Sequence, residues 1–121
     1  MVKRVITDNF KSIRSHSGIA VDYVRGDDSV RLVAVVGSTE FAQESLSGLY
    51  ETSQSRDYLI LTDDLELNGS KVLPERGDEV HEVDDAGTLF VYPVVTSGGG
   101  RVFSYSDTSR VVLRIHTRQA R

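Results

Sequence analysis

The chain has 121 residues, of which 39% are hydrophobic and 26% are charged, and its formal net charge at pH 7 is -4. This length predicts a single domain over residues 1–121, and the composition is that of a globular protein rather than a disordered or fibrous one. No apolar run approaches the roughly 20 residues that a membrane-spanning helix needs. Because the chain has no cysteine, disulfides, thiol nucleophiles and thiolate metal sites are excluded. The net negative charge disfavours a protein whose whole surface grips nucleic acid.

The first segment predicts a short amphipathic helix. Val2, Ile6, Phe10 and Ile13 recur at helical spacing, and Gly18 is placed to end the helix. After Gly18, short runs rich in Val, Ile, Tyr and Phe alternate with clusters of Gly, Asp, Asn and Ser, which is typical of strands and turns.

Six or so short strands then follow with no helix between them. They are "GIAVDYVR", "VRLVAVV", "DYLILTDDLEL" with a bend near Thr62-Asp63-Asp64, the segment that starts at Asp78, "TLFVYPVV" and "RVVLRIHTR". The first two form a predicted hairpin, Asn68-Gly69 marks a further turn, and Pro93 predicts an edge strand or a bulge. This order predicts a mainly β fold, a small antiparallel β-barrel or sandwich with a short N-terminal helix.

Residues 37–55, "GSTEFAQESLSGLYETSQS", interrupt the strands with a mostly polar stretch. We predict a long inter-strand loop here, and loops of this length are usually functional or disordered. Two interpretations remain open, a disordered excursion or a loop whose Leu46, Leu49 and Tyr50 dock outside the domain. Docking is favoured because apolar side chains otherwise gain nothing from a place in a mobile loop.

The last strand carries a basic face in a chain that is acidic overall. Alternation places Val111, Leu113, Ile115 and Thr117 on one face and Arg110, Val112, Arg114, His116 and Arg118 on the other. Two interpretations are equally weighted. The basic face either is a solvated face that discourages edge pairing, or it meets an acidic partner or a phosphate backbone.

No pattern in the sequence indicates catalysis or metal binding. The three histidines, His16, His81 and His116, lack metal-ligand spacing, and no serine stands in a nucleophile motif. The pairs Asp63-Asp64 and Asp84-Asp85 fall at predicted turns, where aspartate is favoured for its bonds to the backbone. We therefore predict no enzyme, no catalytic residue, no metal site and no cofactor.

Two Arg-Gly-Asp tripeptides occur, Arg25–Asp27 and Arg76–Asp78. Each stands where a strand meets a turn, and Gly77 is suited to a positive φ after Pro74 has set the entry to the turn. We interpret both tripeptides as elements of shape rather than as binding sites.

The order of these features resembles the head-tail joining proteins of tailed bacteriophages and prophages, the small head-completion or stopper proteins of the neck. The resemblance covers nearly the whole chain. It rests on four stretches: Asp57–Ile60 with Asp64-Leu65; Pro74 with Gly77-Asp78; Tyr105–Asp107; and Arg114–Thr117. These motifs are structural, so they indicate a family and no active site.

The resemblance implies a small β-barrel that assembles as a homo-oligomeric ring, a hexamer or dodecamer, between the portal or adaptor protein and the tail terminator or tail tube. It implies location in the virion neck, with the host cytoplasm as the location before assembly. Carried over by position, the 37–55 loop would project into the channel and help to retain packaged DNA. The implied channel residues are Glu44, Ser45, Leu46, Leu49, Tyr50 and Glu51, and the basic strand would be a partner surface through Arg110, Arg114, His116 and Arg118.

Two alternatives to this function remain. The protein could be the tail terminator of the same neck, because small β-barrel ring proteins are alike in sequence character. It could also be a monomeric nucleic-acid-binding barrel of the OB type, with Tyr92, Phe103 and Tyr105 as a stacking platform beside the basic strand.

Overall fold

One curled antiparallel sheet forms most of the molecule in the computed structural model, which describes residues 2–44, 47–96 and 100–118. Its seven strands lie in the order β7-β6-β1-β2-β3-β9-β8. Their bounds are β1 Gly18–Arg25, β2 Asp28–Glu44, β3 Tyr50–Leu61, β6 Glu79–Val83, β7 Leu89–Pro93, β8 Phe103–Tyr105 and β9 Val112–Thr117. The short strands β4 (Glu66–Leu67) and β5 (Ser70–Lys71) form a separate hairpin after a 3-10 turn at Thr62–Asp64, labelled η1.

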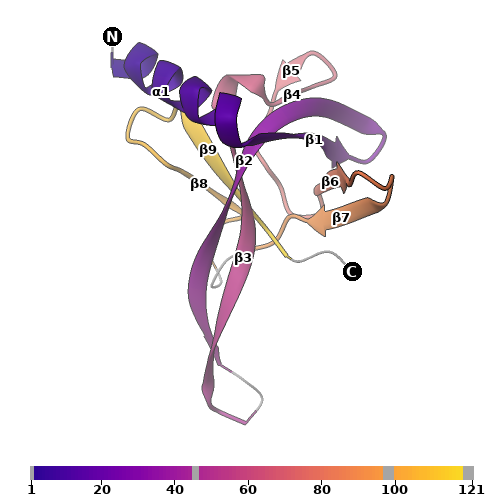
Figure 1. The fold of residues 1–121 in the computed structure, drawn as a ribbon. Helices are drawn as coiled ribbons and strands as arrows, with labels where there is room; N and C mark the ends of the chain where they lie inside the picture. The colour runs from indigo at the N-terminus through magenta and orange to yellow at the C-terminus, as the bar shows by residue number, and fades with distance from the viewer. Residues whose placement is uncertain (1, 45–46, 97–99, 119–121) are drawn as a thin grey trace.

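The concave side of the sheet encloses the main hydrophobic core, and the sheet curls into a half-barrel (Figure 1). Buried side chains come from β1, β2, β3, β6 and β9 and from β4, with Tyr23, Tyr58 and Leu113 among the largest. At one end the sheet begins to close on itself, because Val94, just after β7, bridges to Thr117 of β9. The predicted mainly β fold with a short helix is confirmed.

The predicted N-terminal helix is confirmed as α1, Val2–Ser17. It lies on the convex side of the sheet, where Phe10 is buried with Leu61 and Val112 in a second, smaller core. Of the predicted apolar stripe, however, Val2 and Ile13 remain exposed. The sheet therefore covers only part of the apolar stripe of the helix.

Gly18 ends the helix, because there is no room for a side chain at this position. Its φ is not positive, and a Cβ at this position would lie 2.4 Å from the carbonyl oxygen of Arg14 and 2.7 Å from Cγ1 of Val33. Glycine therefore lets the chain pass directly from the helix into β1.

The predicted turns and the predicted edge strand are confirmed. β1 and β2 form a hairpin whose turn has Gly26 at a φ of 58°. The β4–β5 turn has Asn68 and Gly69 at φ values of 53° and 79°, as a two-residue hairpin turn requires. Pro93 ends β7, which is an edge strand of the sheet.

The prediction of an irregular loop over residues 37–55 is wrong in its conformation. β2 and β3 continue through this segment as paired strands, in a register that runs from Val35 opposite Leu59 to Glu44 opposite Tyr50. The polar sequence of this segment does not show the alternation that predicts a strand, because strands that lie outside the core do not need an apolar face. We call residues 38–55 the arm.

Candidate functional site at the base of the arm

The arm leaves the body of the protein at Gly37 and Arg56. β1 pairs with β2 only as far as Val35, and β9 pairs with β3 only from Arg56 onward. Beyond these points, in the residues that the structure describes, the two strands pair only with each other, and they project well away from the sheet (Figure 1). From Ser38 to Glu44 the arm extends about 20 Å, at about 3.3 Å per residue.

Four of the six predicted channel residues, Glu44, Leu49, Tyr50 and Glu51, are described, and they lie near the tip of this arm. Glu44 and Tyr50 are opposite each other in the last strand pair, and Glu51 is the next residue of β3. Leu49 follows the turn at Gly48 and is 69% exposed. Ser45 and Leu46 lie outside the described residues. The arm is thus a projection whose end carries these four of the residues that the resemblance assigned to the channel.

A buried carboxylate fixes the base of the arm. The side chain of Asp57 is fully buried, and it is surrounded by partners from three strands. Oδ1 accepts a hydrogen bond of 2.6 Å from Ser55 Oγ and lies 2.9 Å from His116 Nδ1. Oδ2 accepts one of 2.7 Å from Arg114 Nη1 and another from the hydroxyl of Thr39. We call these five residues the Asp57 cluster.

The electrostatics of the Asp57 cluster favour the charged carboxylate. Burial by itself raises the pKa of Asp57, but the hydrogen bonds from His116, Ser55, Thr39 and Arg114 outweigh burial and hold this pKa well below its usual range. The cluster joins the first residues of the arm on β2 and β3 to β9. It therefore sets the direction in which the arm leaves the sheet.

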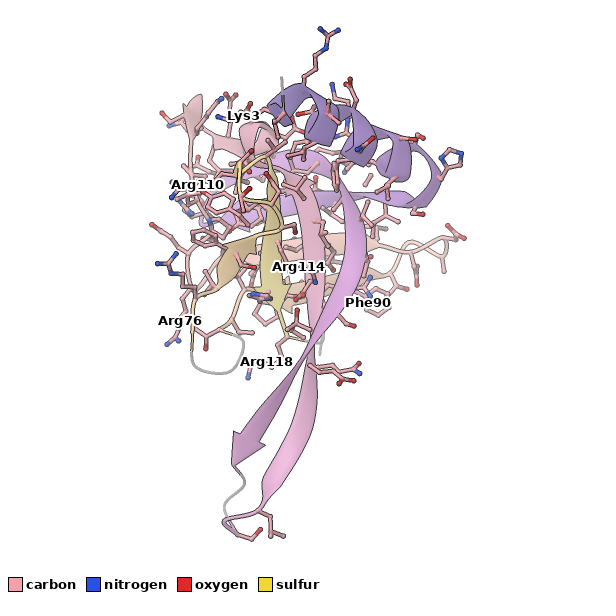
Figure 2. The ribbon with its side chains drawn as sticks, turned by 90° about the vertical axis from the view of Figure 1, so that its left-hand side faces the viewer. Lys3, Arg76, Phe90, Arg110, Arg114 and Arg118 are labelled. Atoms are coloured by element: carbon pink, nitrogen blue, oxygen red, sulfur yellow. The ribbon has the colours of Figure 1, made fainter. Side chains whose placement is uncertain are left out.

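The predicted partner surface does not lie on one open face. Arg114 and His116 turn toward Asp57, and the side chain of His116 is only 9% exposed. Arg110 and Arg118 lie at opposite ends of β9 and are exposed, as Figure 2 shows. The interpretation of β9 as an edge-protecting strand is wrong, because β9 lies between β3 and β8.

A second polar cluster ties the base of the arm across the half-barrel. Arg56 of β3 forms a bidentate ion pair with Glu82 of β6, with distances of 2.8 and 3.0 Å from its Nη2 and Nε to Oε2. Tyr58 donates its hydroxyl hydrogen to the same carboxylate. The guanidinium of Arg56 also lies 4.8 Å from the ring centroid of Tyr92 on β7. We call Arg56, Glu82, Tyr58 and Tyr92 the Arg56 clamp.

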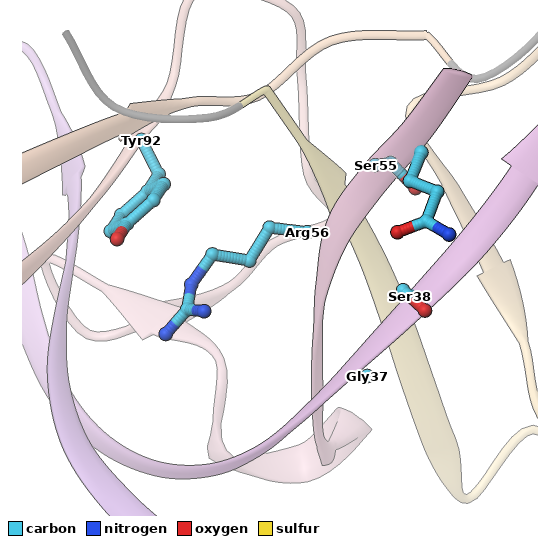
Figure 3. A pocket seen from close by; sticks show the side chains of 6 residues that line it. Gly37, Ser38, Ser55, Arg56 and Tyr92 are labelled. Atoms are coloured by element: carbon cyan, nitrogen blue, oxygen red, sulfur yellow. The ribbon is translucent and has the colours of Figure 1, made fainter. Parts of the chain in front are cut away.

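The clamp borders a shallow hollow of about 260 Å³, seen in Figure 3. Its lining is polar and comes from both strands at the base of the arm and from β7: Gly37, Ser38, Gln54, Ser55, Arg56 and Tyr92. This hollow lacks the apolar enclosure of a small-molecule site.

A second buried carboxylate, that of Asp78, supports the interpretation of the two Arg-Gly-Asp tripeptides as elements of shape. Asp78 accepts hydrogen bonds from Arg25, from the hydroxyl of Tyr23 and from the backbone N–H of Glu75. Burial raises the pKa of Asp78, but these bonds lower it more. Both turns contain a glycine with positive φ, 58° at Gly26 and 98° at Gly77. The tripeptides are thus part of the folded framework.

The absence of catalytic and metal sites stays a prediction. Within residues 2–44, 47–96 and 100–118 there is no group of three or more His, Cys, Asp or Glu side chains that could hold a metal ion. In the same part of the chain, no helix is long and apolar enough to cross a membrane. Asp84 forms the predicted turn, where its Oδ1 accepts the N–H groups of Ala86 and Thr88.

The aromatic side chains of the OB-type alternative do not form an open platform. Tyr92, Phe103 and Tyr105 are half-buried and packed against the main core. Phe103 and Tyr105 also contact each other edge to face, with centroids 5.8 Å apart. Because base stacking needs an exposed ring face, this arrangement counts against that alternative.

The chain was compared with known proteins. A family model described as phage head-tail joining protein matches residues 2–121, nearly the whole chain. Among curated proteins no match is found. The family match confirms the resemblance that the four sequence stretches indicated.

Proposed function

The chain belongs to the phage head-tail joining protein family, and from this premise we propose that it is a non-catalytic protein that forms a ring in the neck. The ring joins the portal or adaptor protein of the head to the tail. The arm of each copy points toward the central channel, where the arms together retain packaged DNA and gate its exit. The observation that carries this proposal is the two-stranded arm that leaves the sheet at Gly37 and Arg56.

An arm of this kind needs contacts that its own chain does not provide. A single two-stranded hairpin is marginally stable in water, and in the described residues the strands of the arm pair only with each other. A ring brings identical arms to one place and adds many weak contacts together. Assembly into a ring therefore provides the additional contacts that such an arm needs.

The charge of the arm favours a steric block of the channel over binding to DNA. Residues 38–55 contain Glu40, Glu44 and Glu51 and no Lys or Arg. Because DNA binding depends on cations that neutralise phosphates, such arms obstruct the channel by their bulk. Their negative charge repels the backbone of DNA, so DNA slides past once the arms move aside.

The base of the arm supports the same role, because a gate has to be held in place. The Asp57 cluster fixes the arm to β9, and the Arg56 clamp ties β3 to β6 and β7. Of the four predicted partner-surface residues, Arg110 and Arg118, which flank β9, remain exposed for an acidic surface of a head or tail protein. Arg114 and His116 act within the chain instead.

The test is to shorten the arm while keeping its register. Ala42 and Thr52 are opposite each other, so Asn-Gly in place of residues 43–51 joins them through a two-residue turn. We expect the purified variant to unfold at the same temperature as the wild type. Heads that carry the variant should package DNA, and added nuclease should then degrade that DNA. The control keeps the full-length arm and replaces Glu40, Glu44 and Glu51 with Gln. Heads that carry it should retain DNA because the block is steric.

Two results would contradict the proposal separately. Heads with the shortened arm that protect their DNA as well as the wild type would exclude the gate. Electron microscopy of isolated necks in which this protein forms no ring would exclude the ring itself.

A further inference from the structure

Arg110 adopts a backbone conformation that is unusual for arginine. Its φ is 61°, and among the described residues Asn68 is the only other non-glycine residue with a positive φ. Glycine and asparagine enter this left-handed region at little cost, whereas other residues are strained there because Cβ approaches the following carbonyl oxygen. Asn68 stands in a hairpin turn that favours asparagine. No preference of this kind explains an arginine at position 110.

The bonds of the loop before β9 account for this conformation but not for the arginine side chain. The N–H of Arg110 donates to the carbonyl oxygen of Asp107 at 3.3 Å, and its carbonyl oxygen accepts a hydrogen bond of 2.9 Å from the hydroxyl of Thr62. Oδ1 of Asp107 accepts the N–H groups of Val111 and Val112 at 3.0 and 2.8 Å. A glycine at position 110 could make the same backbone bonds without strain. The fold therefore requires the turn, and the side chain of Arg110 is available for another role.

The guanidinium of Arg110 is held in place at the surface. Its Cζ lies 5.6 Å from the ring centroid of Tyr105 on β8, a cation–π contact that restricts the side chain. Arg110 is exposed, and no carboxylate among the described side chains forms an ion pair with it. Asp107, the nearest acid along the chain, binds backbone N–H groups instead. The guanidinium is thus ordered before any partner binds, and its N–H groups remain available to a partner.

The loop that carries Arg110 lies at the end of the body opposite the arm. Val111 packs with Ile6 of α1 in the second core. Figure 2 shows Arg110 and Lys3 at the same end of the body, while the arm extends from the other end. In the proposed ring the arm points toward the channel, so Arg110 lies farther from packaged DNA than the arm does. A protein partner is therefore favoured over DNA.

We infer that Arg110 is an anchor residue that binds a carboxylate on the acidic surface of a head or tail protein. A guanidinium binds a carboxylate through two parallel hydrogen bonds, which add direction to the attraction of charge. A side chain that is already ordered loses less entropy on binding, and backbone strain of this kind gathers at functional sites. The inference rests on the proposed function and names one residue of the contact through which the protein joins the neck.

The test combines heads assembled without this protein, purified variants of the protein and tails, and it measures the yield of infectious particles at limiting protein. Arg110→Gly removes the cation and relieves the backbone strain. We expect this variant to unfold at the wild-type temperature or slightly above it, and to lower the yield by about tenfold because a charged hydrogen-bonded pair is lost. An arginine that only stabilised the fold would instead lower the unfolding temperature when it is replaced.

Matched variants separate the backbone, the charge and the shape of the guanidinium. Asn68→Gly changes the other non-glycine residue with a positive φ among those described, and it should leave the yield unchanged. Arg76→Gln removes an exposed arginine from a different turn, and it should also join heads to tails like the wild type. Arg110→Lys keeps the charge without the planar donors, so it should restore only part of the yield.

The outcomes separate this inference from the proposed function. Heads that join tails equally well with and without the wild-type protein would overturn the proposed function itself. A wild-type yield from Arg110→Gly, or full recovery by Arg110→Lys, would overturn the anchor and leave the role in the neck intact. A lower unfolding temperature of Arg110→Gly would show that the arginine serves the fold, and this result would also overturn the anchor.

Two measurements on the purified protein identify the class of partner. A gel-shift experiment with linear duplex DNA should give the same result for the wild type and for Arg110→Gly. DNA binding that this substitution abolishes would identify phosphate as the ligand and would overturn the acidic protein partner. Sedimentation should likewise show the same self-association for both proteins, since its loss in Arg110→Gly would place the carboxylate on a second copy of the chain and contradict the inference.

Discussion

Arg25 and Asp78, the first residue of one Arg-Gly-Asp tripeptide and the last residue of the other, form a bidentate ion pair. Nε and Nη2 of Arg25 each donate a hydrogen bond of 2.9 Å to a different carboxylate oxygen of Asp78. Nη2 also donates to the carbonyl oxygen of Leu73 at 2.7 Å. The repeat in the sequence thus becomes a joint between the β1–β2 hairpin and the turn that precedes β6.

Loss of this joint should destabilise the protein. Arg25→Met removes the guanidinium and leaves the buried carboxylate of Asp78 without its cation, which costs about 3 kcal/mol at a site of this kind. Urea unfolding measures the change. The matched control is Arg76→Met in the other tripeptide, an exposed arginine, which should stay within about 0.5 kcal/mol of the wild type. Equal losses from both variants would show that the ion pair contributes nothing specific.

Stability should fall in acid because two buried carboxylates are held charged. The pKa of Asp57 and that of Asp78 are lower in the folded protein than in the unfolded chain, where an aspartate titrates near about 3.9. Their stabilisation is therefore complete above this unfolded value and is lost as the pH falls below it toward the folded pKa. Urea unfolding at steps from pH 5 to pH 2.5 should show this loss.

The contribution of Asp57 can be isolated from that of Asp78. Asp57→Asn should be less stable at pH 6 and should have a shallower pH dependence, by up to about 1.4 kcal/mol per pH unit for one proton. Ser55→Ala, which removes one hydrogen bond and keeps the carboxylate, should be destabilised but retain most of the slope. An unchanged slope in Asp57→Asn would assign the acid sensitivity to other groups.

The junction between helix and sheet should be intolerant of a methyl group. In Gly18→Ala the added Cβ would lie 2.4 Å from the carbonyl oxygen of Arg14, so the backbone has to shift at a cost of about 1 to 3 kcal/mol. Thermal unfolding followed by circular dichroism measures the effect. Ser17→Ala, one residue earlier in the helix, should change stability by less than about 0.5 kcal/mol. Similar melting of the two variants would mean that the junction relaxes freely.

The sequence predicted the fold well wherever local chemistry decides the structure. Asn68-Gly69 required a tight turn, Pro93 required an edge, and alternation in "GIAVDYVR" buried Val21 and Tyr23. These features depend on the residues themselves and on their immediate neighbours. The pattern of the helix was equally clear, although it did not show that Val2 and Ile13 would remain exposed.

The site was harder to predict because it depends on register between distant strands. Alternation placed Arg114 and His116 on one face, but only the pairing of β3 with β9 sets His116 directly opposite Asp57. Thr39 and Ser55, which complete the cluster, stood inside a polar stretch that showed no strand periodicity. The available signal was Asp57 itself, a charged residue at the start of the apolar run "YLIL".

The continuity of β2 and β3 from the core to the arm also has a mechanical consequence. Ile60 of β3 is buried in the main core, and the same strand runs on to Tyr50 near the tip without a bend or a loop between. A pull on the end of the arm loads β2 and β3 together, so it acts as shear on the ladders that join them to β1 and β9, while a sideways push acts as a lever on the Asp57 cluster. The arm therefore resists a pull along its length, and a lateral force acts mainly on its base.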